Sequence, residues 1–95
     1  FITNELLMFR ARLCFREKNY KTAKDLIEKV SDKWIKNTDH HTNILFWSYK
    51  AFIEEKNKNF DEAFKCFEKS QLNLKYQNFN PEIFQEYIKT YRKNL

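Results

Sequence analysis

Hydrophobic residues recur at steps of three and four along most of the chain, and this spacing predicts helices. The first segment, residues 4–19, carries apolar positions from Leu6 to Cys14, with Thr3 or Asn4 available as its cap. The second segment runs from Tyr20 to Trp34 and ends in a polar cluster at residues 36–39. The first part of the chain therefore predicts two helices with a short break near residues 17–19.

The rest of the chain predicts three more helices. One begins at Asp39 or Thr42 and ends near residues 57–59, and the next runs from Phe60 to about residue 74. The last starts with Asn80 as cap and Pro81 at the first helical position, a strong start pattern, and reaches residue 95. Short links between the segments predict an all-α domain of antiparallel hairpins.

Composition supports this fold class. The chain has 95 residues, of which 42% are hydrophobic, so we expect one domain over residues 1–95 with enough apolar surface for a core. Gly is absent, which disfavours tight β-hairpins and excludes Gly-rich phosphate loops. The chain starts with Phe, so we expect a fragment of a longer protein. No apolar run approaches the ~20 residues of a membrane span, and no membrane partner is expected.

Two stretches of the sequence repeat one pattern, NYKTAKDLIEKV at residues 19–30 and NFDEAFKCFEKS at residues 59–70. Subtracting 20 from 60 gives an offset of 40 residues, and this offset aligns both helices of each hairpin. The aligned pairs keep side-chain size and polarity: Leu6 with Phe46, Leu7 with Trp47, Phe9 with Tyr49, Leu13 with Ile53, Tyr20 with Phe60 and Ile27 with Phe67. The repeat predicts two stacked antiparallel hairpins with a period of about 40 residues.

Alanine occupies four positions of this repeat, Ala11 and Ala23 in the first unit and Ala51 and Ala63 in the second. Small side chains allow the two helices of a hairpin to cross closely. We therefore expect each Ala pair at such a crossing. The C-terminal helix would then cap the open end of the second hairpin.

The chain resembles the tetratricopeptide repeat (TPR) family over about residues 5–75, with a C-terminal capping helix. The residues that carry the resemblance are Leu7, Ala11, Tyr20, Ala23, Ile27 and Val30, and then Trp47, Ala51, Phe60, Ala63, Phe67 and Ser70. The period is longer than the usual ~34 residues. Arg10 and Lys50 stand where the family commonly has Leu, Ala replaces a common Gly, and Ser70 replaces a common Ala. The family's usual binding residues are therefore not transferred to this chain.

The stretch from Ile44 to Leu95, closed by YQNFNPE and a final helix, is also similar to the C-terminal halves of Rgg-like peptide-responsive bacterial regulators. That resemblance implies a cytoplasmic protein with a DNA-binding domain before a helical-repeat domain. The helical-repeat domain of such regulators binds a short signalling peptide and dimerises. We therefore expect a regulatory module involved in transcription regulation.

In stacked hairpins, the first helices of successive units line the concave side. The predicted peptide-binding residues on these helices are Met8, Arg12, Phe15, Arg16, Ser48, Phe52 and Lys56. This mixed apolar and basic set suits an extended peptide or protein segment with an acidic group or a free carboxylate. The alternative is that Phe15 and Phe52 are core residues and the cations are simply solvated.

Catalytic and metal chemistry have little support in the sequence. Cys14 and Cys66 lack ligand spacing and are expected as reduced thiols, and the adjacent His40 and His41 make a poor chelate. No nucleophile has a base at a recognisable spacing, so neither an enzyme nor a cofactor or metal site is expected. Glu54 and Glu55 are interpreted as the solvated end of a helix.

The net charge of +5 comes from 18 basic and 13 acidic residues spread along the whole chain. A nucleic-acid reader would cluster its bases in one stripe, so direct nucleic-acid binding by this chain is not expected. The second functional hypothesis is a structural or assembly scaffold that mediates protein–protein contacts. A homodimer remains open under either hypothesis.

Overall fold

The structure, a computed structural model, describes residues 3–75 and residue 89, and the regular structure in this part is α-helix joined by short turns. Its helices are α1 (Asn4–Arg16), α2 (Tyr20–Glu28), α3 (Asp32–Asn37), α4 (His40–Lys56) and α5 (Phe60–Lys75). The predicted all-α class is confirmed for these residues. The predicted helix after Asn80, with its predicted capping role, lies outside the described residues. Only residue 89 of that segment is described. None of the helices described combines the length and apolar character that crossing a membrane requires.

Side-chain caps set the starts of α1 and α4. The Thr3 hydroxyl accepts a hydrogen bond from the Leu6 amide at 3.2 Å. Asp39 Oδ1 accepts one from the Thr42 amide at 2.7 Å, and its Oδ2 accepts one from the Thr42 hydroxyl at 3.1 Å. These bonds to the charged carboxylate lower the pKa of Asp39. Both caps are among those that the sequence predicted.

The predicted continuous helix from Tyr20 to Trp34 is wrong. It ends at Glu28, and a separate short helix, α3, begins at Asp32. The reason lies at Ser31, which has an extended backbone and whose hydroxyl accepts a bond from the Trp34 amide at 3.4 Å. The Ser31 amide donates to the Asn4 side-chain oxygen at 2.9 Å, which fixes the break to the start of α1.

The turn between α1 and α2 has a defined hydrogen-bond pattern. The Asn19 amide donates to the Cys14 carbonyl at 2.8 Å, and the Lys18 amide donates to the Phe15 carbonyl at 3.0 Å. Lys18 has φ of 65°, in the left-handed region. This is a Schellman motif, in which the residue after the helix cap takes a conformation that favours Gly.

The turn between α4 and α5 repeats this geometry 40 residues later. The Asn59 amide donates to the Glu54 carbonyl at 2.9 Å, and the Lys58 amide donates to the Glu55 carbonyl at 3.0 Å. Lys58 also has φ of 65°. Because the chain contains no Gly, lysine takes the left-handed position in both turns. The two copies of the sequence pattern therefore fold into the same local turn.

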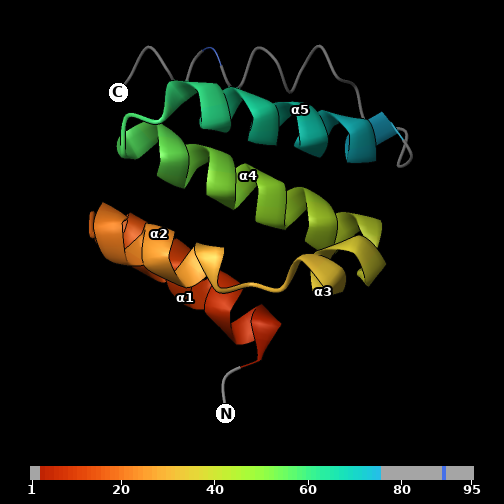
Figure 1. Cartoon of the computed structure of the whole chain (residues 1–95), viewed down its shortest axis with the longest axis horizontal. Coiled ribbons are helices and arrows are strands. Elements are labelled where there is room, and N and C mark those ends of the chain that lie inside the picture. Colours follow the sequence, from red (N-terminus) through yellow and green to blue (C-terminus); the bar gives the residue numbers. More distant parts are fainter. Residues whose placement is uncertain (1–2, 76–88, 90–95) are drawn as a thin grey trace.

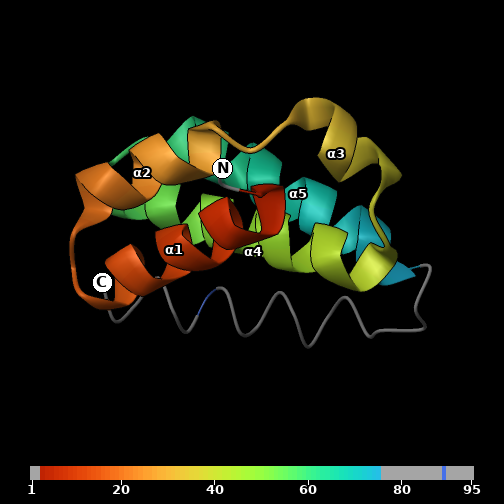
Figure 2. The same ribbon diagram turned by 90° about the horizontal axis from the view of Figure 1, so that it is seen from below.

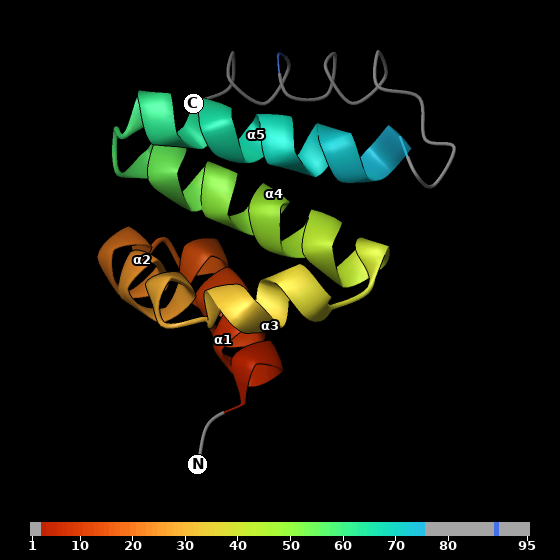
Figure 3. The ribbon, with the colours of Figure 1, turned by 45° about the vertical axis from the view of Figure 1, so that its right-hand side comes forward.

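The helices form two pairs, the first pair (α1 and α2) and the second pair (α4 and α5). In Figures 1 and 3, α4 lies between the first pair and α5. The closest packing is between α4 and α5 and between α1 and α2, and α4 also contacts α1, α2 and α3. Figure 2 shows α1 and α4 side by side, with α3 beyond α2 along the chain. The side-chain amide of Asn57 links the pairs by donating to the Tyr20 carbonyl at 3.0 Å.

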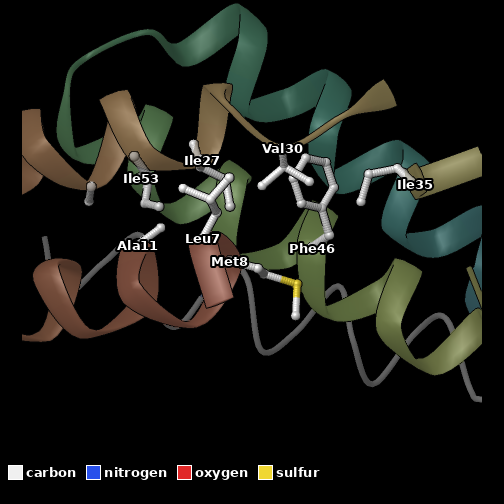
Figure 4. Packing of buried hydrophobic residues seen from close by; sticks show 9 residues of the cluster. Leu7, Met8, Ala11, Ile27, Val30, Ile35, Phe46 and Ile53 are labelled. Carbon is white, nitrogen blue, oxygen red and sulfur yellow. The ribbon is translucent and has the colours of Figure 1, made fainter. Parts of the chain in front are cut away.

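The main core lies where α4 meets the first pair. Figure 4 shows Ile27 and Val30 meeting Leu7 of α1 and Phe46 of α4. The remaining buried members of this cluster are Met8, Ala11, Ala23, Ile35 and Ile53. A second cluster joins Ala51 of α4 to Ala63, Cys66 and Phe67 of α5. Helix α4 therefore contributes buried side chains to both clusters.

The four alanines of the repeat have no exposed surface in the folded chain. Ala11 and Ala23 belong to the first cluster, and Ala51 and Ala63 belong to the second. Each alanine pair therefore joins the two helices of one pair, as close helix crossings require.

Candidate functional site

The seven predicted site residues come from α1 and α4, which contact each other. Five of them keep exposed side-chain surface, and we group them under the name α1–α4 face: Arg12, Phe15, Arg16, Phe52 and Lys56. Arg12 and Arg16 are exposed, while Phe15, Phe52 and Lys56 are half-buried. The structure thus gives this face an apolar base with cations around it.

A row of aromatic rings crosses the α1–α4 face. The Phe15 ring lies 5.5 Å from the Tyr20 ring of α2 and 6.4 Å from the Phe52 ring, measured between centroids. The Phe52 ring meets the Phe67 ring of α5 edge-on at 5.4 Å. The row therefore joins four helices, and its two central rings keep part of their surface exposed. Packed aromatic rings that keep one side exposed to solvent are well suited to bind an apolar side chain of a ligand.

Two cations of this face are held against aromatic rings. The Arg12 guanidinium lies 5.5 Å from the centroid of the Tyr49 ring. The Lys56 ammonium lies 5.5 Å from the centroid of the Tyr20 ring. Such contacts limit the freedom of long cationic side chains while leaving their charge available. The face can therefore offer positioned positive charge to a carboxylate.

The other two predicted residues do not line this face. Met8 is 1% exposed and packs in the main core. The Ser48 hydroxyl lies 2.9 Å from the Ser70 hydroxyl and forms a hydrogen bond between α4 and α5. Helical spacing put both side chains among the surface positions, but neighbouring helices cover them.

Sequence reasoning missed a pocket of about 700 Å³ between α2 and the second pair. Its lining is Lys24, Glu28, Lys50, Glu54, Lys58, Asn59, Phe60, Asp61, Glu62 and Lys65. The interpretation of Glu54 and Glu55 as a solvated helix end is wrong, because both side chains are buried. The sequence did contain a signal for this pocket, because the 40-residue offset aligns the charged Glu54 with the uncharged Cys14.

Glu54 is engaged by the protein itself. Its Oε2 accepts hydrogen bonds from Lys24 Nζ at 3.3 Å and from Asn59 Nδ2 at 3.1 Å, and its Oε1 lies 3.3 Å from Lys24 Nζ. Lys24 also pairs with Glu28 at 3.6 Å. Glu54 is only 2% exposed, so the pair ties α2 to α4. The pocket lining carries four lysines and four acids, which leaves it without a net charge to attract one class of ligand.

The Cys66 thiol is buried in the second cluster. Burial raises the pKa of the Cys66 thiol to about 11, so it stays protonated at neutral pH. Cys14 and Cys66 are both free cysteines. Among residues 3–75 and 89, no cluster of three or more His, Cys, Asp or Glu side chains could hold a metal ion. The α1–α4 face is therefore the best-supported site in this part of the chain.

Compared with protein-family models, curated proteins and solved structures, the chain gives no match.

Proposed function

We propose that the chain is a TPR-like helical-repeat module in which the two helix pairs are stacked copies of one hairpin. The support is the 40-residue sequence offset together with the matching turns at Lys18 and Lys58. The buried alanines at equivalent positions support the same arrangement. Stacked hairpins of this kind commonly present an extended surface for peptides or proteins.

The module's function, in this proposal, is non-enzymatic binding of a peptide or protein segment. The observation that carries it is the α1–α4 face, where the half-buried rings of Phe15 and Phe52 lie 6.4 Å apart and the same two helices carry the cations Arg12, Arg16 and Lys56. The rings would hold an apolar side chain. The cations would bind an acidic side chain or the free carboxylate of an extended peptide.

The biological setting we propose is the regulatory part of a cytoplasmic bacterial transcription regulator that senses a signalling peptide. Its support is the similarity of residues 44–95 to Rgg-like regulators. The proposal predicts a helix-turn-helix domain encoded upstream of Phe1 in the complete gene. A complete gene without a DNA-binding domain would contradict the regulatory setting and leave the peptide-binding proposal standing.

Peptide binding is tested with a short fluorescein-labelled peptide that carries two aspartates, a leucine and a free C-terminal carboxylate. Fluorescence anisotropy is expected to show binding to the chain. Arg12→Glu together with Arg16→Glu is expected to weaken it by about tenfold or more, because charge-assisted hydrogen bonds are lost. Both side chains are exposed and only the contact of Arg12 with the Tyr49 ring is lost, about 0.5–1 kcal/mol, so the melting temperature should fall by only a few degrees.

The matched control is Lys33→Glu together with Lys36→Glu, which changes the net charge equally at exposed positions of α3. The control should leave the affinity close to that of the unchanged chain. An equal loss in both double variants would mean that the peptide follows the overall charge and not the α1–α4 face. Absence of binding by the unchanged chain would also contradict the proposal.

The alternative function is a scaffold that mediates protein–protein contacts. The observation that favours it is a set of exposed apolar side chains on α1, Leu6, Phe9 and Leu13. Light scattering with and without the acidic peptide separates the two functions. A constitutive assembly that ignores the peptide supports the scaffold, whereas a peptide-dependent response supports the binding module.

A further inference from the structure

The side of α1 that faces away from α4 carries three exposed apolar side chains, which we call the outer stripe. Leu6 is 42% exposed, Phe9 47% and Leu13 56%. Their spacing of three and four residues places them on one side of the helix. Arg10, also exposed, lies among them. Phe15 of the α1–α4 face lies on another side of α1, toward the Phe52 ring, whereas Arg12 and Arg16 follow Phe9 and Leu13 by three residues and lie next to the stripe.

The second helix pair shows what covers such a stripe. With the 40-residue offset, the outer stripe corresponds to Phe46, Tyr49 and Ile53 of α4. Phe46 is 3% exposed, Ile53 is fully buried, and Tyr49 is half-buried. All three pack in the cluster that the first pair forms with α4, as Figure 4 shows for Phe46 and Ile53. A helix pair therefore covers this position in the second unit.

We propose that the outer stripe of α1 is a docking surface for a helix pair of a partner protein that resembles the first pair in shape and is acidic. The shape follows from continuity, because the same apolar positions on α4 already receive the first pair. The stripe also keeps the apolar class of its counterparts at every position. The proposal rests on the repeat correspondence and does not depend on peptide binding at the α1–α4 face.

Charge decides which partner fits. The counterpart of Arg10 is Lys50, which lines the same pocket as Glu28 of α2 and Glu54. On α1, the position equivalent to Glu54 is occupied by Cys14, so Arg10 has no carboxylate at that place on its own helix. The partner must therefore supply the carboxylate near Arg10. A second copy of this chain, with a net charge of +5, is a poor source of the negative charge.

Cys14 also specifies the partner side chain opposite it. In the folded chain, Lys24 of α2 meets Glu54 at 3.3 Å. A lysine at the same place in the docked partner would meet the Cys14 thiol and lose its counter-charge. The partner is therefore expected to carry an apolar residue where α2 carries Lys24, and a carboxylate where α2 carries Glu28.

The test uses an extended chain in which a second copy of residues 3–42 precedes residue 3, with Lys24→Leu, Lys33→Glu and Lys36→Glu in that copy. The two Glu substitutions are at exposed positions and make the added copy acidic, as the proposal requires. The added residues then lie at the 40-residue spacing and serve as the probe for the outer stripe. In the unchanged chain, Leu13→Lys should shift the melting temperature by less than about 2 °C, because the side chain is exposed. In the extended chain, the same substitution in the original copy should lower it by about 5 °C or more.

The matched control is Phe64→Lys on α5, a side chain that is 54% exposed. It should shift the melting temperature equally in the two chains. Equal effects of Leu13→Lys in both chains would overturn the proposal, as would added residues that stay unfolded by circular dichroism. Sedimentation of the unchanged chain should give a monomer. A dimer that Leu13→Lys dissociates would show that a second copy occupies the stripe and would also overturn it.

Discussion

The first and second helix pairs have turns of the same geometry but differ in the lengths of their helices. Both turns place a lysine at φ of 65° and make the same pair of backbone hydrogen bonds. Yet α2 has 9 residues and α5 has 16. The turn depends only on a few neighbouring residues, whereas helix length depends on where a competing cap occurs. Ser31 is such a cap, and Gln71 stands at its equivalent position.

The two pairs also differ in what covers their first helices. Helix α4 lies between the first pair and α5, while the outer stripe of α1 is exposed. Equivalent apolar residues are therefore interior in one copy and surface in the other. A repeat pattern therefore specifies where apolar side chains lie on a helix, while the neighbours present decide which of them are buried.

Truncation of one equivalent residue in each copy should have very different effects on stability. Ile53→Ala removes a fully buried side chain and should cost about 2–5 kcal/mol of unfolding free energy. Leu13→Ala removes an exposed one and should cost less than about 1 kcal/mol. Urea denaturation followed by circular dichroism measures both values. Similar costs would show that α1 and α4 have equivalent surroundings in solution.

The helix crossings offer a comparison in which the two copies should agree. Ala23→Leu and Ala63→Leu both force a larger side chain into a fully buried position, one in each pair. Each should cost about 1–3 kcal/mol, because overpacking pushes the helices apart. Thr22→Leu, an exposed neighbour on α2, serves as the control in the same denaturation experiment. Full tolerance of leucine at either alanine would mean that the helices do not cross there.

The contact between the copies includes a charged pair to which each copy contributes one residue, Lys24 of α2 and Glu54 of α4. Lys24→Met leaves Glu54, 2% exposed, without its cation and should cost about 1–2 kcal/mol. The cost stays below the roughly 3–5 kcal/mol of a fully buried pair, because the Lys24 side chain is 30% exposed and Asn59 still donates to Glu54. Lys21→Met, at an exposed position of α2, is the matched control. Equal melting temperatures for the two variants would argue against the pair as a link.

The same pair predicts a pH dependence. Burial acts to lower the pKa of Lys24, but the hydrogen bond and charge of Glu54, with the charge of Glu28, outweigh it and raise the pKa above 10.5. The stabilisation is therefore complete below the pKa of lysine in the unfolded chain and is lost as the pH rises through the raised pKa. The difference in melting temperature between the unchanged chain and Lys24→Met should stay constant from neutral pH and shrink in strong alkali.

Much of the fold followed from local sequence. A few neighbouring residues determine the caps at Thr3 and Asp39 and the breaks near residues 17–19 and 57–59. The burial of the alanines depends on one helix face. The break at Ser31 was missed because its apolar neighbours Val30 and Trp34 continue the helical spacing. The side chain of Asn4, 27 residues away, helps to hold that break and is invisible to a local pattern.

The candidate site was predicted less completely for the same reason. Exposed cations such as Arg12 and Arg16 are surface residues in most contexts, and the structure places them so. Burial of Met8 and Glu54 depends on how α4 packs against the first pair, which helical spacing does not determine. The charge balance of the pocket likewise arises from three helices that meet only in the folded chain.

The smallest expected effect concerns the feature that the two copies share most closely. Lys18→Gly and Lys58→Gly should each stabilise the fold by about 0.5–1 kcal/mol, because Gly takes the left-handed conformation without the steric cost of a Cβ atom. The greater freedom of Gly in the unfolded chain offsets part of this gain. Lys21→Gly, inside α2, should instead destabilise by about 1 kcal/mol. Urea denaturation measures the unfolding free energy of each variant. If only one of the two glycine variants is more stable than the unchanged chain, the two turns have the same geometry but different strain. Residues outside the turn would then compensate for the left-handed lysine in one copy.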